Sequence, residues 1–467
     1  MILSRPLLLL FPITTTAIFT ATTDILVTGF LPSCFSLPLS VSRREIIIGS
    51  GGGLLLSSTT SDDSAQMSSS SSSSSSSQKI RWGIVGLGDV TQVKSGPPFW
   101  KCEGSELVAV MRRTPGKAAE FAAKVPKNGK SECAGYENLD VFLKHPGMEA
   151  VYVATRPGTH FEIAKKVADA GLACYVEKPV GRCAAETKEL TEIFERKGLP
   201  FYTAYISRAY ERTQAVRKLM RDGVIGDKLV KVSYLLRGTG GAKDMATTDL
   251  PWRLDASQSG GGLIMDVGCH VFDRIDYLCG PLEQVKGTAE HRSQNNNNGG
   301  IDNIPVENYC RATATVGAAP WASIPKGGCE GAAVDLTWDF SSNNDDNGAI
   351  DELQFVGSNG RTLKMAGMSP TGPVEVLDED GSTVIESLTF DMPKHTAQRL
   401  IQAVTNDLVD RKTQHRHRQR VDYLSFGDNA IRTQRVIDTM LDSYYGGREI
   451  GYWSRMDSWP GRPVDTQ

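Results

Sequence analysis

Two acids and a histidine interrupt a largely apolar stretch, residues 260–280, which opens with three glycines. Asp266, His270 and Asp273 are separated by four and then three residues, so on a helix they would share one face. Burying that face is costly unless its polar groups are paired. A histidine beside a carboxylate can also move protons near neutral pH. The stretch therefore predicts either one wall of an active site or a hydrogen-bonded polar group inside a core.

A pair of glycines, Gly86 and Gly88, follows a short strand expected over residues 79–85. Glycine permits a tight turn at position 86 and lets a pyrophosphate approach the backbone at position 88. A helix after this turn would offer its N-terminal amides to the phosphates. Thr91 stands where the dinucleotide-binding fingerprint has its third glycine, so the surrounding pattern has to support the motif.

The surrounding pattern is a regular alternation of strands and helices. Strands are expected over residues 106–111, 150–154, 174–176 and 201–204, with helices running to residue 124 and over residues 159–170 and 184–197. This alternation is typical of a parallel sheet with helices on both faces. It predicts an α/β dinucleotide-binding (Rossmann) domain over residues 79–204.

The end of the second expected strand bears on the choice of cofactor. An acid there would bind the ribose 2′-hydroxyl of NAD(H), whereas an arginine accommodates the 2′-phosphate of NADP(H). The chain has Arg112 and Arg113 at this place and no acid. We therefore predict NADP(H) rather than NAD(H). The alternative is that both arginines are solvated charges where a helix opens.

Lys178 follows the fourth expected strand, between Glu177 and Pro179. The carboxyl edge of a parallel sheet faces the crevice in which ligands bind, so a lysine there points toward a ligand. The proline suggests a cis peptide bond that would set the direction of the lysine. The alternative is a structural lysine, capping or exposed.

With these residues the chain resembles the glucose–fructose oxidoreductase and inositol dehydrogenase family (Gfo/Idh/MocA), from about residue 79 to the C-terminus. Four motifs in order carry the resemblance: Gly86-x-Gly88, Ala154-Thr155-x-Pro157-x-x-His160, Glu177-Lys178-Pro179 and Asp266-x-Gly268-x-His270-x-x-Asp273. Thr91 and Arg156 depart from the family pattern.

The resemblance implies that Lys178, Asp266 and His270 surround the nicotinamide. His270 would be the general acid/base, Lys178 would hydrogen-bond the reacting oxygen, and Asp266 would orient the substrate or the imidazole. Asp273 would either tune His270 or anchor the helix. The cofactor contacts implied are Gly86, Gly88, Arg112, Arg113, Thr155, His160, Glu177 and Lys178.

Four further residues are candidate substrate contacts. Trp252 and Arg253 precede the polar helix by a short loop, and a tryptophan there could stack on a sugar face. Arg208 and Tyr210 follow the fifth expected strand. Trp252 could equally well only pack against its neighbours.

The pattern changes from residue 205 onward. Strands are expected over residues 228–236, 307–316, 332–340, 352–356, 362–365, 374–377 and 383–388, and helices over residues 208–222, 395–410 and 426–444. These runs predict an α+β substrate and dimerisation domain, residues 205–467, with a large, mostly antiparallel open sheet and C-terminal helices. The resemblance implies a homodimer or homotetramer that associates through this sheet.

Residues 1–78 read as a targeting segment and linker rather than as part of the fold. Residues 7–19 are mostly apolar, Arg43 and Arg44 precede a second apolar run, and residues 68–77 are all serine. The two signals resemble the layered targeting peptides of plastid proteins, and the twin arginines suggest the thylakoid lumen. The secretory pathway, a mitochondrion and a membrane anchor are the alternatives. After processing we expect no stable membrane insertion.

Composition narrows the class of protein. The chain has 467 residues, a formal net charge of −3 and nine cysteines. The charge gives no reason to expect nucleic acid as a partner. The scattered cysteines argue against a disulfide framework and a structural zinc site, so no metal is expected. His415 and His417 form an H-x-H in a basic segment that reads as a solvated loop.

Taken together, the sequence predicts an NADP(H)-dependent oxidoreductase acting on a secondary hydroxyl or carbonyl of a small molecule: a sugar, a polyol or a cyclic diol. One alternative is a non-catalytic nucleotide-binding sensor of the same fold, although such a protein would be expected to lack one of Lys178, Asp266 and His270. The other is a sugar–sugar oxidoreductase with permanently bound NADP.

Overall fold

The computed structural model describes residues 79–127, 132–238, 252–292, 306–341, 348–414 and 421–448. The targeting segment, the loop over residues 294–303, and His415 and His417 lie outside these ranges. All described residues belong to one compact unit, which holds two β-sheets.

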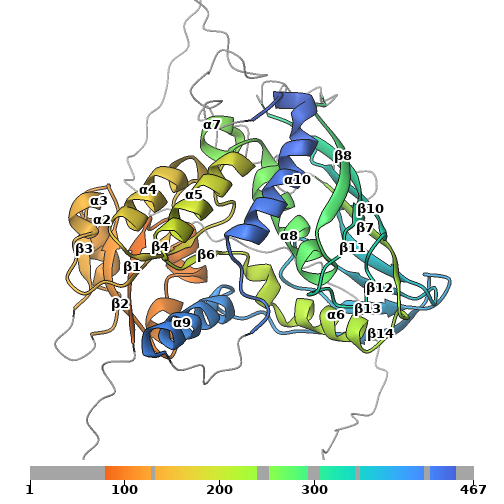
Figure 1. Cartoon of the computed structure of the whole chain (residues 1–467), viewed down its shortest axis with the longest axis horizontal. Coiled ribbons are helices and arrows are strands. Elements are labelled where there is room, and N and C mark those ends of the chain that lie inside the picture. The colour runs from red at the N-terminus through yellow and green to blue at the C-terminus, as the bar shows by residue number, and fades with distance from the viewer. Residues whose placement is uncertain are drawn as a thin grey trace, which may run out of the picture. The chain divides into compact units, whose positions relative to one another are not determined.

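The first sheet has six strands in the order β3-β2-β1-β4-β5-β6, and every pairing is parallel (Figure 1). The strands are β1 Ile80–Val85, β2 Ser105–Met111, β3 Ala134–Tyr136, β4 Ala150–Val153, β5 Ala173–Val176 and β6 Phe201–Thr203. All residues of β4 and β5 are buried, as expected for strands covered on both faces. The predicted Rossmann fold is confirmed.

Helices cover both faces of this sheet. They are α1 Pro98–Lys101, α2 Lys117–Ala122, α3 Leu139–Phe142, α4 Pro157–Asp169 and α5 Ala184–Arg196. The short β3 and α3 were not anticipated. A C-terminal helix, α9 Gln398–Thr413, also joins this layer: its Leu400, Ile401 and Val404 pack in one core with Trp82 and Tyr152 of the sheet. The sequence pattern placed this helix with the second domain, because periodicity identifies a helix but not the sheet it covers.

The second sheet has eight strands in the order β14-β13-β12-β11-β7-β10-β9-β8. They are β7 Leu229–Arg237, β8 Leu282–Glu290, β9 Tyr309–Val316, β10 Ala333–Asp339, β11 Ile350–Gly357, β12 Thr362–Met365, β13 Val374–Leu377 and β14 Val384–Leu388. Only β7 and β10 pair in parallel; the other pairings are antiparallel, as predicted. Strand β8 was missed, since it is an edge strand with mostly exposed, polar residues that give no alternation.

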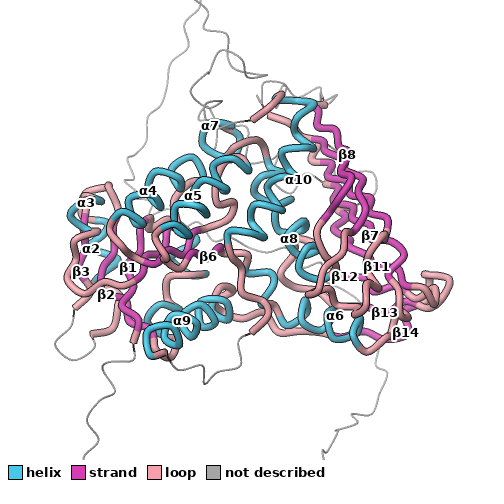
Figure 2. The backbone as a smooth tube through the Cα atoms, viewed as in Figure 1, coloured by secondary structure: helices cyan, strands magenta, loops and turns pink. Residues whose placement is uncertain are grey.

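Helices lie on one side of this second sheet (Figure 2). They are α6 Glu211–Arg221, α8 Cys269–Leu278 and α10 Gly427–Tyr445. The helix expected over residues 208–222 is divided: a 3₁₀ turn, Ile206–Ala209, is followed by Tyr210 in an extended conformation, and α6 begins after it. No helix in the described part of the chain is long and apolar enough to span a bilayer.

Candidate active site

The glycine turn after β1 is built around two different requirements. Gly86 has a φ of +95°, and a Cβ there would lie 2.5 Å from the carbonyl oxygen of Ala154, so only glycine fits. A Cβ on Gly88 would meet no atom of the protein within 4 Å. The fold itself therefore does not require glycine at position 88. The open space there suits a ligand that approaches the backbone.

The segment after the turn is not the regular helix that we expected. Val90–Lys94 forms a single π-helical turn of 5 residues. Thr91 is buried, and its hydroxyl donates to the carbonyl oxygen of Gly88 at 2.7 Å. The side chain that replaces the third glycine thus closes the turn onto itself. Any phosphate would meet the backbone of this turn rather than the end of a long helix.

A cleft of about 910 Å³ runs from this turn along the carboxyl ends of β1, β2 and β4. Among the predicted cofactor and substrate residues, it is lined by Gly86, Gly88, Arg112, Arg113, Thr155, Trp252 and Arg253. Lys178, Asp266 and His270 are not among the residues that line it, but Arg253, which does line it, contacts Asp266 at 2.7 Å.

Three arginines give this cleft a positive wall. Arg112 is half-buried and donates to the carbonyl oxygen of Leu87, whereas Arg113 and Arg156 are exposed. Within the described residues, none of the three forms an ion pair with a carboxylate. The chain thus leaves positive charge available where phosphates of a dinucleotide would lie.

Lys178 and Asp266 form the contact between the two halves of the site. The Lys178 Nζ donates to the Asp266 Oδ1 at 2.7 Å and to the Asp266 carbonyl oxygen at 2.8 Å. Arg253 Nε donates to the other carboxylate oxygen, also at 2.7 Å. Burial alone would raise the pKa of Asp266, but Lys178 and Arg253 outweigh it and hold the pKa well below its usual range. Likewise, burial would lower the pKa of Lys178, and Asp266 raises it above its usual range.

His270 lies one turn further along and is partly exposed. Its Nδ1 is buried and has no hydrogen-bond partner among the described residues. Its ring meets the ring of Tyr205 edge-on, with centroids 6.4 Å apart. Burial, and next the charge of Lys178, lower the pKa of His270 well below 6.5. The imidazole is therefore neutral at physiological pH.

The stretch that carries these residues is not one regular helix. Asp266 lies in a π-helical turn, Ile264–Gly268, and His270 lies in the first turn of α8. Upstream, the amide of Gly262 donates to Glu307 Oε1 at 2.7 Å, and Arg448 donates to the carbonyl oxygen of Gly260. Glycines allow this close approach, because a Cβ on Gly262 would lie 2.7 Å from the Glu307 backbone.

Comparisons with known proteins place this geometry in a family. The model described as "Oxidoreductase family, NAD-binding Rossmann fold" matches residues 80–205, and the model for the GFO/IDH/MocA C-terminal domain matches residues 213–361. The chain belongs to the Gfo/Idh/MocA oxidoreductase family.

Two curated relatives illustrate the range of this family. Oxidoreductase P35 of Formosa agariphila is 32% identical over 208 residues, which is 44% of this chain and 63% of the relative. Trans-1,2-dihydrobenzene-1,2-diol dehydrogenase of Mus musculus is 30% identical over 219 residues, 46% of this chain and 60% of the relative. The matched segment spans less than two thirds of the length of each relative.

Solved structures share the fold. Aldose-aldose oxidoreductase from Caulobacter crescentus, complexed with glycerol, matches with a TM-score of 0.60 at 22% identity. The match covers 79% of this chain and 98% of the chain of that structure. Biliverdin reductase from Synechocystis, complexed with biliverdin and NADP+, matches with a TM-score of 0.57 at 20% identity. This match covers 78% of this chain and 98% of the chain of that structure.

In this member of the Gfo/Idh/MocA family, His160 is buried away from the cleft, whereas Glu177 is partly exposed. His160 is completely buried, with Nδ1 2.9 Å from the carbonyl oxygen of Pro179 and Nε2 3.0 Å from that of Thr155. Burial lowers the pKa of His160 to about 4, so the neutral ring donates from one nitrogen only. Glu177 accepts from the hydroxyl of Tyr152, and burial raises its pKa. The structure thus gives His160 a positioning role in place of the predicted cofactor contact, while the contact predicted for Glu177 stays a prediction.

His160 supports the turn at Pro179, which directs Lys178. The Lys178–Pro179 peptide bond is cis, as the sequence suggested. One ring therefore joins the segment after β4 to the segment after β5.

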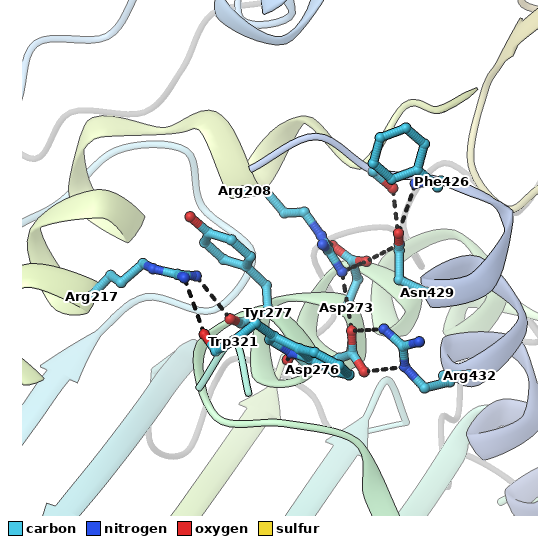
Figure 3. A network of polar contacts seen from close by, with 10 residues as sticks. Arg208, Arg217, Asp273, Asp276, Tyr277, Trp321, Phe426, Asn429 and Arg432 are labelled. Carbon is cyan, nitrogen blue, oxygen red and sulfur yellow. Dashed lines mark hydrogen bonds and ion pairs between the residues drawn. The ribbon is translucent and has the colours of Figure 1, made fainter. Parts of the chain in front are cut away.

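Arg208 and Asp273 bind each other on the side of α8 shown in Figure 3. Arg208 Nε and Nη2 each donate to the Asp273 carboxylate at 2.7 Å, and Asn429 Nδ2 donates to it at 3.0 Å. Asp276 accepts hydrogen bonds from Arg208 and Arg432 in the same network. Asp273 therefore anchors the helix to its neighbours. The prediction that Arg208 contacts substrate is wrong for this geometry, because its guanidinium is buried and donates to the carboxylates of Asp273 and Asp276.

The other substrate candidates remain near the site. The Arg253 guanidinium carbon lies 4.4 Å from the centre of the Trp252 ring, and both side chains line the cleft. Tyr210 is half-buried at the start of α6. Sequence reasoning missed Glu307, although three consecutive glycines already signalled that some group must approach the backbone closely.

Replacing Lys178 with methionine is expected to raise the pKa of His270. After burial, the Lys178 charge is the strongest influence lowering it, and removing that cation also leaves the Asp266 charge less compensated. The measurement is a pH titration of the imidazole nitrogens by NMR, with the signal assigned from His270→Gln. Lys188→Met is the matched control, since that ammonium pairs with Glu192 on the surface of α5. A His270 pKa that does not move in Lys178→Met would contradict the assigned interaction.

Proposed function

We propose that the chain is an NADP(H)-dependent oxidoreductase that transfers a hydride to or from the carbon of a secondary alcohol or carbonyl in a sugar, polyol or cyclic diol. The observation that carries the proposal is the 2.7 Å contact between Lys178 and Asp266, which holds a charged donor whose field acts on a neutral His270 one helical turn beyond Asp266. The names of relatives, which include a dihydrodiol dehydrogenase and a sugar reductase, support this substrate range.

The residues of the cleft fit a dinucleotide. The open space above Gly88 leaves room for a pyrophosphate against the backbone, and Arg112 and Arg113 stand at the end of β2 with no acid beside them. Bound there, NADP+ would accept, or NADPH would supply, the hydride. The two arginines support NADP(H) over NAD(H).

His270, Lys178 and Asp266 would divide the remaining chemistry. In the oxidising direction, the neutral His270 takes the proton from the substrate hydroxyl. The Lys178 ammonium has three N–H donors, of which two are directed to Asp266. The third is available to the reacting oxygen and would stabilise the negative charge that develops on it. Asp266 keeps this ammonium charged and fixes its direction.

The retention of these three residues also argues against a non-catalytic sensor. A sensor would need neither a neutral histidine with a free nitrogen nor a lysine held by two oxygens of one aspartate. The proposal therefore keeps the enzyme as the function of the chain.

Gly86→Ala and Gly88→Ala form a matched pair of variants that separates folding from cofactor binding. Gly86→Ala is expected to lower the free energy of unfolding by about 1–3 kcal/mol, because alanine is strained at positive φ and meets Ala154. Gly88→Ala should leave unfolding unchanged and weaken NADPH binding about tenfold or more, since its methyl would occupy the ligand space. Urea unfolding and fluorescence titration with NADPH measure the two effects. Normal NADPH affinity in Gly88→Ala would contradict the assigned cradle.

The double variant Arg112→Ala/Arg113→Ala is expected to weaken NADPH binding about 10- to 100-fold, which corresponds to losing charged hydrogen bonds to one phosphate. NADH binding should change little, because NADH lacks the 2′-phosphate. Arg196→Ala, an exposed arginine at the end of α5, is the control. Equal losses for both nucleotides would refute a 2′-phosphate contact.

Lys178→Ala and His270→Asn are each expected to lower kcat about 10²- to 10⁴-fold and leave NADPH affinity within a few-fold. Because the pKa of His270 lies well below 6.5, kcat/KM for alcohol oxidation should stay high through pH 6.5 and fall only below it. Steady-state rates across pH with an accepted substrate test both points, with Lys188→Ala as the control. Undiminished turnover in either variant would overturn the proposed roles.

A further inference from the structure

Around the three proposed catalytic residues, cationic side chains outnumber the carboxylates that could neutralise them. Asp266 accepts from both Lys178 and Arg253, and the only other carboxyl group that acts on Lys178 among the described residues is Glu177, whose pKa is raised by burial. Arg253 uses its Nε for this contact, and its outer guanidinium nitrogens have no partner among the described residues. This arginine is 43% exposed at the cleft, so its remaining donors are accessible.

A second pair of cations, Arg212 and Arg274, lies behind the site. Each residue is 1% exposed, and each donates to backbone carbonyl oxygens only: Arg274 to Gly367 at 2.6 Å, and Arg212 to Thr371 at 2.6 Å and to Ala366. The Nε of each guanidinium is buried without a hydrogen-bond partner in the described part of the chain. Buried charges of one sign in such proximity are normally compensated.

The charges of two carboxylates, Asp351 and Asp273, act on this pair, but Asp273 is already bound by Arg208 and Asn429. Asp351 accepts from the hydroxyl of Tyr234 at 3.1 Å and from the amides of Gly367, Met368 and Ser369 at 2.7–3.0 Å. Its oxygens are thus spent on other donors. Burial, and next the charge of Arg274, lower the pKa of Arg212 to about 9, as expected for a cation without its own counter-ion.

The two groups of cations meet at the site. Arg274 follows His270 by four residues on α8, so the two share one face of the helix. Three cations, Lys178, Arg274 and Lys94, and one carboxylate, Asp266, are the charges that act most strongly on His270. Burial raises the pKa of the Tyr210 hydroxyl, and the charges of Arg274, Arg212 and Lys178 lower it. An anion beside Tyr210 and His270 would face a surplus of positive charge from both sides.

The dinucleotide does not account for this surplus. Its phosphates would lie at the glycine turn and at Arg112 and Arg113, whereas Tyr210, Arg212 and Arg274 do not line that cleft and Arg253, which does, is bound to Asp266. Lys178 already suffices to stabilise the oxygen that reacts. The remaining charge needs a second anionic partner.

We propose that the substrate is itself an anion, a sugar or polyol that carries a carboxylate or phosphate group close to the carbon that reacts. Arg253 and Tyr210 would contact this group directly, while the buried Arg212 and Arg274 would stabilise it through their charge. The inference rests on the proposed function, since it concerns the substrate of the same site.

The test compares neutral and anionic ligands of matched shape. The full chain, loaded with NADPH so that oxidation cannot occur, is titrated by calorimetry with glucose, glucuronate, gluconate and glucose 6-phosphate, and with inositol and inositol 1-phosphate. At least one anion should bind tenfold or more tightly than its neutral counterpart, and this preference should shrink as salt is raised. A carboxylate preferred over a phosphate, or the reverse, identifies the group.

Variants then locate the interaction. Arg253→Gln should lower the affinity for the anion about tenfold more than the affinity for the neutral ligand, so that most of the preference is lost. Arg274→Lys keeps the buried charge and should retain the preference, which distinguishes charge from packing even if Arg274→Met fails to fold. Arg311→Gln, whose guanidinium pairs with Asp335 on the second sheet, is the control.

The outcomes separate this inference from the proposed function. Neutral ligands that bind as tightly as the anions, in a protein that oxidises neutral sugars with NADP+, would overturn the inference and leave the function standing. Tight anion binding without turnover of any bound ligand would support the inference and overturn the function. Binding of no ligand in either class would overturn the inference as well.

Discussion

The ion pair between Lys178 and Asp266 is the interaction on which the site depends. It joins the carboxyl edge of the parallel sheet to the polar helix that packs on the second sheet, with Nζ and Oδ1 2.7 Å apart. The Lys178 side chain is 14% exposed and that of Asp266 is 25% exposed, so water screens the pair only in part. Removing one partner of a buried pair costs about 3–5 kcal/mol, because the other charge remains uncompensated. The pair is therefore both a connection between two layers and a means of keeping an ammonium charged and aimed.

The elements around this pair are arranged to hold it still. His160 ties the cis peptide after Lys178 to the segment after β4, and Glu307 fixes the glycines that precede Asp266. Further along, Arg208, Asn429 and Arg432 bind Asp273 and Asp276, which fastens α8 to α10 and to the turn before α6 (Figure 3). The polar atoms of these residues are engaged with the chain's own backbone and side chains. They act on the chemistry only through the residues that they position.

Much of the fold follows from local patterns in the sequence. The apolar runs of β4 and β5 and the alternation in β9 identify strands because burial on two faces or on one leaves a distinct periodicity. Edge strand β8 lacks that signal since most of its side chains are exposed. The association of α9 with the first sheet could not be predicted, because the amphipathic face of a helix does not specify its partner. The π-helical turns at Thr91 and Asp266 depend on tertiary contacts and also escape local rules.

The site shows the same division between what spacing can and cannot predict. Asp266, His270 and Asp273 look equivalent in the sequence, but the structure separates them by how fully their hydrogen-bonding capacity is used. Asp273 has its oxygens occupied by Arg208 and Asn429, which is the mark of a structural group. Among the described residues, His270 Nδ1 has no hydrogen-bond partner, and Lys178 Nζ directs only two of its three donors to acceptors. A fold tolerates such unused capacity at a cost, and a ligand that completes it recovers that cost. Unsatisfied groups around one point, rather than polar spacing alone, therefore distinguish the half of this helix that acts on a substrate from the half that anchors it.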